Sequence, residues 1–521
     1  MVIFLKYKII IGLILVILAC CGIYAAFNGN HSIENSQIDI SQLEAENNII
    51  VSEQRNMEKK LFSSDKADTN AILVENNSTL NIKDSVVNKT GDSSDNSDNV
   101  DFYGTNSAIL VKKGSSATIN DVEIYTNSTG SNAVFVTNAQ PNDESSTGNS
   151  NGNMMSNEQP PSMPENGDGG QPMGIPEGGN GEQPDSMPEE QPTGDNNGNN
   201  VPMTDTSGED YSSGGANAVM NNVIINTYQD KSRGIDATYG GNVTADNVLI
   251  NTRGGSCAAL ATDRGEGTVV VDNSELNTGV DNGTGRGSPI IYSTGDISVS
   301  NCKGTAYVSQ IACIEGKNSI TMNDCDFNSF AGGNREENGE YVDLGGIFIY
   351  QSMSGDANVG TATLDATNTK LSIDENSEHY SKAPMFHVTN TKAIINITGC
   401  ELSFGSGTLL DVSGQNQWGD VGSNGGDLEF NAVKEKLDGN ICVDEISSLV
   451  FNMKDSDYTG TINSDDTYGN TSVSIDSGSS WTLTGDGHVT SLENRGNIEY
   501  GEYALYVNGE KYTKNNPYPS K

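Results

Sequence analysis

The sequence predicts an all-β fold: a right-handed parallel β-helix of roughly twelve coils, with a disordered insert and a C-terminal hairpin cap. Three observations predict it. A short motif recurs at steps of 25, 26, 28 and 23 residues. Apolar residues alternate inside each copy. The composition combines 59 glycines with only 34% apolar residues, which is typical of turn-rich β structure and low for a globular enzyme of this length.

The motif has eight positions: apolar, any, apolar, any, Asp or Asn, small, any, apolar. Copies begin at Leu80, Ala117, Ala218, Val243, Val269, Ile297, Ile320, Ile395 and Phe451. The alternation indicates a strand with one inward face. The fifth position is Asp, Asn or, in one copy, Gly, which are the residues that accept the left-handed conformation, so each repeat bends there. The small sixth residue then fits inside the bend.

A second apolar run precedes each motif, for example at residues 71–74, 108–111 and 289–292. Each repeat therefore supplies two or three short strands and the corners between them. Repeats that cannot bury an apolar face alone are typical of solenoids. Stacked coils would pair strand on strand in parallel, about 4.8 Å apart.

The N-terminal segment, residues 1–27, reads as an export signal or membrane anchor. Lys6 and Lys8 precede a nearly continuous apolar run. Residues 17–20 resemble a lipoprotein cleavage box, which would make Cys20 the lipidated N-terminus. An uncleaved anchor and cleavage near residues 24–26 are the alternatives. All three predict an exported chain, and the first two tether it to the membrane at the cell surface.

The rest of the chain divides by composition. Residues 28–68 are polar and are expected to form a stalk, followed by N-terminal coils at 69–138, main coils at 215–480 and a cap at 481–521. The cap is expected because Asn508-Gly509 is a strong hairpin signal. Residues 139–214 hold 10 of the 14 prolines, and residues 141–210 hold 14 acidic residues and no basic one. Such a segment cannot build a core, and it is predicted to be a disordered excursion from one coil.

The charge excludes one class of partner. The chain carries 70 acidic and 28 basic residues, for a net charge of −42. Such a chain repels nucleic acid, and membrane contact is expected only through the N-terminal segment.

Several phrases resemble a known family. They include SAILVKKG, SPIIYSTGDISVSN, IFIYQSMSGDANVGTAT and WTLTGDGHVTSLEN, and the similarity spans about residues 70–515. They resemble adhesin-like bacterial surface proteins whose right-handed parallel β-helix is related to that of pectate lyases. The resemblance implies an exported, carbohydrate-binding protein and supplies no catalytic residues.

Four arginines are the candidate ligand-binding residues: Arg233, Arg253, Arg264 and Arg286. Three of them precede a glycine just before a strand, so they could stack into a cationic ridge that binds carboxylates of acidic sugars. The alternative is local pairing with Asp236, Asp263 or Asp272.

Two further clusters have a functional and a structural interpretation. Asp246, Asp272, Asn323 and Asp324 fall at adjacent corners and could bind Ca²⁺, but a turn explains the acidic ladder equally well. Cys302 and Cys325 lie one coil apart, a spacing that allows a disulfide. Stacked free thiols that act as small apolar residues are the favoured interpretation.

These observations favour a non-catalytic surface protein that binds a polysaccharide or a surface protein and requires no cofactor. A polysaccharide lyase acting on acidic glycans is the first alternative, and a passive surface rod is the second.

Overall fold

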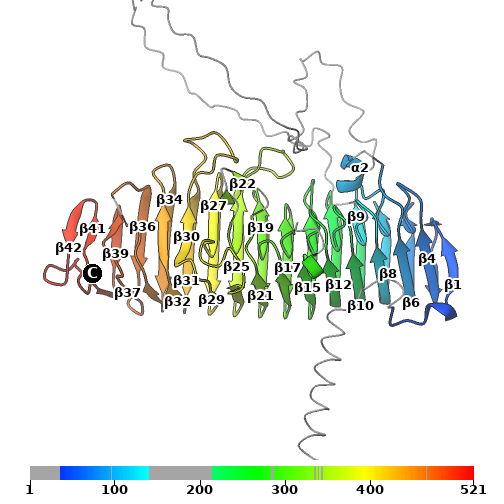
Figure 1. The fold of residues 1–521 in the computed structure, drawn as a ribbon, viewed down its shortest axis with the longest axis horizontal. Helices are drawn as coiled ribbons and strands as arrows, with labels where there is room; N and C mark the ends of the chain where they lie inside the picture. The colour runs from blue at the N-terminus through cyan, green and yellow to red at the C-terminus, as the bar shows by residue number, and fades with distance from the viewer. Residues whose placement is uncertain are drawn as a thin grey trace, which may run out of the picture.

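The computed structural model describes residues 36–94, 97–139, 214–282, 287–333, 336–337, 340–341, 344–464 and 466–520. Figure 1 shows a long rod of stacked coils that runs from β1 at one end to β41 and β42 at the other. In the described residues, strand pairings are parallel except β22–β23 and β41–β42. The predicted parallel β-helix is therefore confirmed.

Two long sheets form the faces of the rod. In most coils, a first and a second strand meet at a corner and both belong to a 21-stranded sheet. Its strands are β1 (Glu44–Asn47), β3 (Arg55–Glu58), β4 (Lys60–Ser64), β6 (Thr79–Lys89), β8 (Ser116–Thr126), β10 (Asn217–Thr227), β12 (Asn242–Thr252), β14 (Thr268–Asp272), β15 (Glu275–Thr278), β17 (Asp296–Ser300), β18 (Lys303–Ala306), β20 (Ser319–Asn323), β21 (Asp326–Ser329), β25 (Thr361–Thr367), β26 (Lys370–Ile373), β28 (Lys392–Thr398), β29 (Glu401–Ser403), β31 (Asp427–Val433), β34 (Ser448–Lys454), β36 (Asn470–Ile475) and β39 (Ser491–Asn494).

The third strand of each coil belongs to a 12-stranded sheet, which agrees with the predicted number of coils. Its strands are β2 (Ile49–Val51), β5 (Ile72–Val74), β7 (Ile109–Lys112), β9 (Val134–Thr137), β11 (Ile235–Thr238), β13 (Leu260–Thr262), β16 (Ile291–Ser293), β19 (Ala312–Glu315), β24 (Ile347–Tyr350), β27 (Phe386–Thr389), β30 (Thr408–Val412) and β33 (Asn440–Val443). The stack continues beyond β33 through a parallel bridge between Ile441 and Ile462.

Smaller elements complete the described fold. The second strands of the last coils are β32 (Lys436–Asp438), β35 (Asp457–Thr459), β37 (Ser480–Thr482) and β40 (Asn497–Glu499), and the end of the rod adds β38 (Gly487–Val489), β41 (Leu505–Val507) and β42 (Glu510–Tyr512). The loops hold η2 (Ile40–Gln42), α2 (Ser97–Asp101), η5 (Val280–Asn282), β22 (Glu336–Glu337) and β23 (Glu340–Tyr341).

The core runs through the inside of the rod because motif positions one and three point inward. Val269 and Val271, for example, are at most 1% exposed. In the C-terminal coils the core contains a column of aromatic rings, with neighbouring centroids 5.3–6.0 Å apart. The column comprises Phe386, Phe430, Phe451, Tyr458 and Trp481. The apolar interior that continues from coil to coil is the core of the rod, in place of the compact core of a globular domain.

The predicted bend at motif position five is confirmed in every copy. The residue at this corner position has a positive φ, between 47° and 63°. The nine predicted corner residues are Asp84, Asp121, Asn222, Asn247, Asn273, Asn301, Asp324, Gly399 and Asp455. Asn368, Lys59 and Lys434 have the same conformation at the corners of further coils.

The predicted stalk, residues 28–68, is wrong over its second half. Strand β2 pairs with β5, and β3 and β4 pair with β6, so residues 49–64 form the first complete coil, and β1 stacks on β4 from the other side. The charged residues that suggested a stalk lie on the outside of this coil, while Ile49, Val51 and Phe62 point inward. The solenoid therefore begins before the predicted boundary at residue 69.

The strand pairings on either side of the predicted insert, and those at the C-terminal end, test the predicted boundaries of the insert and the cap. Strand β10 pairs with β8 and β11 pairs with β9, so the chain resumes the stack after the predicted insert without a missing coil. Residues 140–213 lie outside the described residues. At the other end, β41 and β42 form the predicted antiparallel hairpin. Strands β39 and β40 still pair with coils below them, so the cap is shorter than residues 481–521.

Within the described residues, no helix is long and apolar enough to cross a bilayer. The predicted anchor, residues 1–27, with the lipidation candidate Cys20, lies outside them.

Candidate functional site

The corner residues form a ladder of side chains along the rod. The amide of each corner asparagine donates to a side chain of the preceding coil: Asn222 to Asp121 at 3.0 Å, Asn247 to Asn222, Asn273 to Asp246 at 2.8 Å, Asn301 to Asp272 at 2.8 Å and Asn368 to Asp324 at 3.2 Å. These asparagines are exposed. An amide has a second N–H and a carbonyl oxygen, so each rung keeps polar groups for a ligand.

The sixth position, which we call the ladder position, lies inside the corner. Where this residue is Ser, Thr or Glu, its side chain accepts a hydrogen bond from the backbone N–H at the ladder position of the preceding coil, because the bend removes that N–H from strand pairing. Ser274 accepts from Val248 at 3.0 Å, and Thr369 accepts from Cys325 at 3.3 Å. Glu435 serves the same purpose for Cys400 at 2.8 Å.

Cys302 and Cys325 occupy the ladder position as free thiols. Each is at most 4% exposed and donates to a backbone carbonyl two residues earlier. The hydrogen bond from the Cys325 thiol lowers the pKa of Cys302. The structure thus shows the free thiols that the sequence favours and not the possible disulfide.

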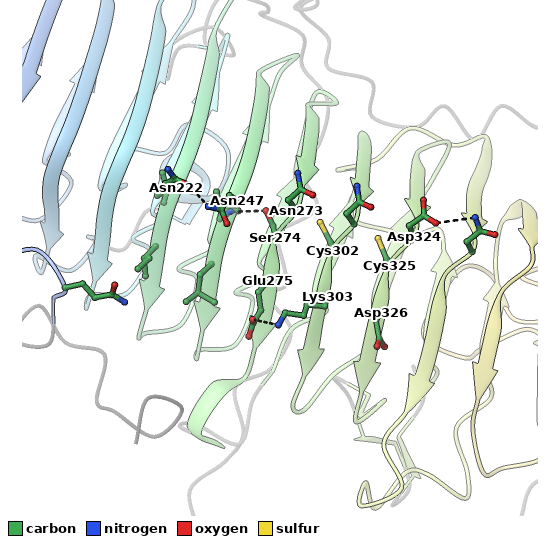
Figure 2. Close-up of a pocket in the computed structure, with 17 residues that line it drawn as sticks. Asn222, Asn247, Asn273, Ser274, Glu275, Cys302, Lys303, Asp324, Cys325 and Asp326 are labelled. Atoms are coloured by element: carbon green, nitrogen blue, oxygen red, sulfur yellow. Dashed lines mark hydrogen bonds and ion pairs between the residues drawn. The ribbon is translucent and has the colours of Figure 1, made fainter. Parts of the chain in front are cut away.

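A shallow open groove of about 1010 Å³ follows this corner across six coils (Figure 2). The corner amides form one side, and the ladder residues form its bottom. Position seven of the motif supplies the other side, with Ile224, Leu249, Glu275, Lys303 and Asp326. Gln37, which precedes the first coil, lies at one end. The groove presents amides, aliphatic surface and charges to the same ligand.

The charges at position seven alternate in sign. Glu275, Lys303, Asp326 and Lys370 follow one another on paired strands. Lys303 Nζ lies 3.0 Å from Glu275 Oε2. Opposite charges on neighbouring strands support each other and fix the register. The groove therefore has little net charge along this row, although the chain as a whole is strongly acidic.

Alignment of the motif copies would have identified this side of the groove. The position was read as "any residue" because its members share no chemistry. They share a location instead, since each follows the ladder residue and points outward. Of the predicted site residues that the structure describes, Cys302, Asp324 and Cys325 line the groove, and the others lie elsewhere.

Arg233 is 9% exposed and lies among three carboxylates. Its Nη2 is 2.9 Å from Asp263, and its Nη1 is 3.5 Å from both Asp101 and Asp236. Burial alone would lower the pKa of Arg233, but the carboxylates raise it. Burial raises the pKa of Asp236 to about 6, against the opposing effect of Arg233.

The other two candidate arginines that the structure describes, Arg253 and Arg264, are also paired. Arg253 is 5% exposed, bonds Asp281 at 3.1 Å and lies 4.3 Å from the ring centroid of Tyr228. Arg264 bonds Asp356 at 2.8 Å and lies 3.9 Å from the ring centroid of Phe102. These arginines do not form an exposed ridge, because loops that cover the solenoid supply their partners. Arg286 lies outside the described residues.

The candidate calcium ligands are spread along the corner. Asp246, Asp272 and Asp324 each accept an amide N–H from the next coil, and Asn323 lies at the end of β20. No group of three or more His, Cys, Asp or Glu side chains that could hold a metal ion occurs in the described part of the chain. The alternative interpretation, in which these residues form hydrogen-bonded turns, accounts for the contacts of the three aspartates.

In comparisons with known proteins, no protein-family model matches this chain, and no curated protein sequence matches it.

Proposed function

We propose that the chain is an exported, adhesin-like surface protein that binds a polysaccharide along the corner groove without turning it over. The groove carries the proposal. It is open, it continues across six coils, and it repeats the same amide side chain on nearly every rung. A site with these properties suits an extended polymer with repeated hydroxyl groups, because many weak contacts add along its length.

The chemistry of the two sides supports a glycan. The corner amides offer both donors and acceptors to hydroxyl groups. Ile224 and Leu249 are half-buried and offer aliphatic surface for the C–H faces of a sugar ring. Binding sites for small ligands usually combine apolar lining with a few polar groups in this way. Attachment through residues 1–27 would display the rod at the cell surface.

The test is retention of the full chain on neutral and uronate-bearing polysaccharides, with and without Ca²⁺, together with absorbance of unsaturated product. We expect retention without product. Product formation would make the protein a lyase, and absence of both would leave a passive rod.

A matched set of variants locates the site. Asn247→Gly, Asn273→Gly and Asn301→Gly together remove three amides, while glycine keeps the positive φ that the corner requires. We expect this triple variant to lose retention. Asp455→Gly also replaces a corner side chain by glycine, but at a corner that does not line the groove, and it should bind as the unchanged chain does. Equal retention of both variants would contradict the groove as the site.

A further inference from the structure

Two aromatic side chains, Tyr307 and Phe330, lie beyond the position-seven side of the groove, and we call them the aromatic ledge. Lys303, Thr305 and Tyr307 alternate outward along β18 and the residue after it. Residues two apart on a strand share a face, so Tyr307 lies about 13 Å along the strand from Lys303. Its side chain is 39% exposed, which is high for an aromatic residue in this fold.

Tyr307 contacts the coils on both sides of it, through its ring on one side and its backbone on the other. On the next coil, Phe330 packs against it with ring centroids 6.2 Å apart and an interplanar angle of 34°. On the preceding coil, the backbone N–H of Tyr307 donates to Thr278, and the following residue is Gly279. Gly279 has a φ of +66°, and a Cβ there would come within 3.0 Å of Val308. Glycine therefore allows the close approach of Val308, the residue that follows Tyr307, to the preceding coil.

Polar groups surround the ledge. The backbone N–H of Thr305 donates to the side-chain oxygen Oδ1 of Asn277 at 3.1 Å. Burial raises the pKa of Tyr307, and the carboxylates of Glu275, Asp281 and Asp374 raise it further, so these groups lie near the ring. Glu275 is balanced by Lys303, and Asp281 by Arg253. The ledge therefore combines an aromatic face with acceptors whose charge is largely compensated.

We propose that Tyr307, supported by Phe330, is the platform on which a pyranose ring of an uncharged glycan stacks. This inference rests on the proposed function, because it names the ligand class of the same groove. The C–H face of a pyranose packs on an aromatic ring, and the surrounding carboxylates and amides accept its hydroxyl protons. The charged residues that line the groove are Glu275, Asp324 and Asp326 against Lys303, and the net charge of the chain is −42, so the electrostatic field repels polyuronates.

The experiment measures the affinity of the full chain for a soluble β-glucan, a galactomannan, polygalacturonate and chitosan. We expect the tightest binding to one of the two neutral polymers. Tyr307→Ala should weaken that binding at least tenfold, and Tyr307→Phe should stay within about twofold, because the ring is kept. Tyr503→Ala is the matched control, since Tyr503 is 41% exposed in the loop before β41.

The outcomes separate the two proposals. If the unchanged chain binds a neutral glycan and Tyr307→Ala binds it equally well, the platform is wrong while the glycan-binding function stands. Preferred binding of polygalacturonate would overturn the ligand class, and so would binding of chitosan that stays tighter than that of the neutral polymers at high salt, where non-specific attraction to the acidic chain is screened. If the unchanged chain binds none of the four polymers, both proposals fall. Should Tyr307→Ala unfold at a lower temperature than the unchanged chain, Tyr307→Gln replaces it, because the longer side chain keeps contact with Phe330.

Discussion

Glu435 occupies the ladder position of its coil, whereas nearby coils have Ser, Thr or Cys at this position. One carboxylate oxygen accepts from the N–H of Cys400 at 2.8 Å, and the other is buried with no hydrogen-bond partner among the described residues. The residue is 2% exposed. Burial raises the pKa of Glu435 to about 6, from an ordinary value of 4.5.

The first prediction concerns the pH dependence of stability. The folded chain holds the Glu435 proton up to about pH 6, whereas the unfolded chain loses it near 4.5. The contribution of Glu435 is therefore most favourable below pH 4.5, declines between 4.5 and 6 and stays constant above. The expected loss is on the order of 2 kcal/mol. Thermal unfolding of the C-terminal coils, followed from pH 4 to 7, measures it.

Glu435→Gln is the control. Glutamine keeps the acceptor for Cys400 but has no charge to bury, so its unfolding temperature should change less between pH 4.5 and 6. The variant should also be more stable than the unchanged chain at pH 7. An identical pH dependence in both chains would show that Glu435 is not the group responsible.

At the scale of single residues, the sequence predicts those features that depend on the residue type alone. Asp, Asn and Gly at position five marked nine corners correctly, because these residues tolerate a positive φ. Lys59 and Lys434 adopt the same conformation, but lysine has no preference for it, so their corners could not be recognised. Glu435 was missed because it is not small and its coil was not counted.

At the scale of elements, the segment around α2 is held against the solenoid by charge and ring contacts. Asp101 bonds both Lys231 and Arg233, at 3.1 and 3.5 Å. The rings of Tyr103 and Tyr239 stack with centroids 5.8 Å apart. The loop therefore covers the outer face of the third-strand sheet, and Arg233 connects it to that sheet.

The second prediction is that Arg233→Gln destabilises this region by about 3–5 kcal/mol, because Asp236 and Asp263 remain buried without their cation. Hydrogen exchange at residues 97–106 and 235–238 should rise together. Arg495→Gln is the matched control, since Arg495 pairs with Glu493 on the surface and is 61% exposed. Its loss should cost less than about 1 kcal/mol. Equal effects of the two variants would show that burial of the Arg233 cluster contributes nothing.

The arginines also show why this part of the site was not predictable. Their local sequences, such as Ser232-Arg233-Gly234, correctly place them before strands. Whether they face solvent depends on loops from distant coils: Asp101 pairs with Arg233, and Asp356 with Arg264. A repeat pattern describes what each coil does and contains no information about which loop folds over it.

At the scale of the whole molecule, the repeat alone predicts a solenoid, its parallel pairing and its approximate number of coils. The first coil was missed because its outward residues are charged and its motif is incomplete. The groove was also missed, although its residues recur at a fixed motif position. Its shape depends on the positive φ at each corner acting in register across six coils, which becomes visible only when the coils are stacked.

The last prediction concerns the two ends of the rod. A solenoid is stabilised by contacts between neighbouring coils, so an exposed end affects the nearest coils most. At the C-terminal end, β41 pairs with β38 and with β42. Tyr518 adds hydrogen bonds to Leu492 and Tyr500, at 2.8 and 2.9 Å. These contacts close the edge that β38 would otherwise present to another chain.

Truncation after Glu502 removes both strands and Tyr518. We expect the truncated chain to self-associate in size-exclusion chromatography, because the edge of β38 and the buried surface beneath Leu505 become exposed. Hydrogen exchange should rise in β36–β40 and remain unchanged before β30, since only adjacent coils lose contacts. Removal of residues 519–521 alone leaves the hairpin and Tyr518 intact and should change neither measurement. A monomeric truncated chain with unchanged exchange in β36–β40 would mean that the last coils are stable without the hairpin, and that its role lies elsewhere.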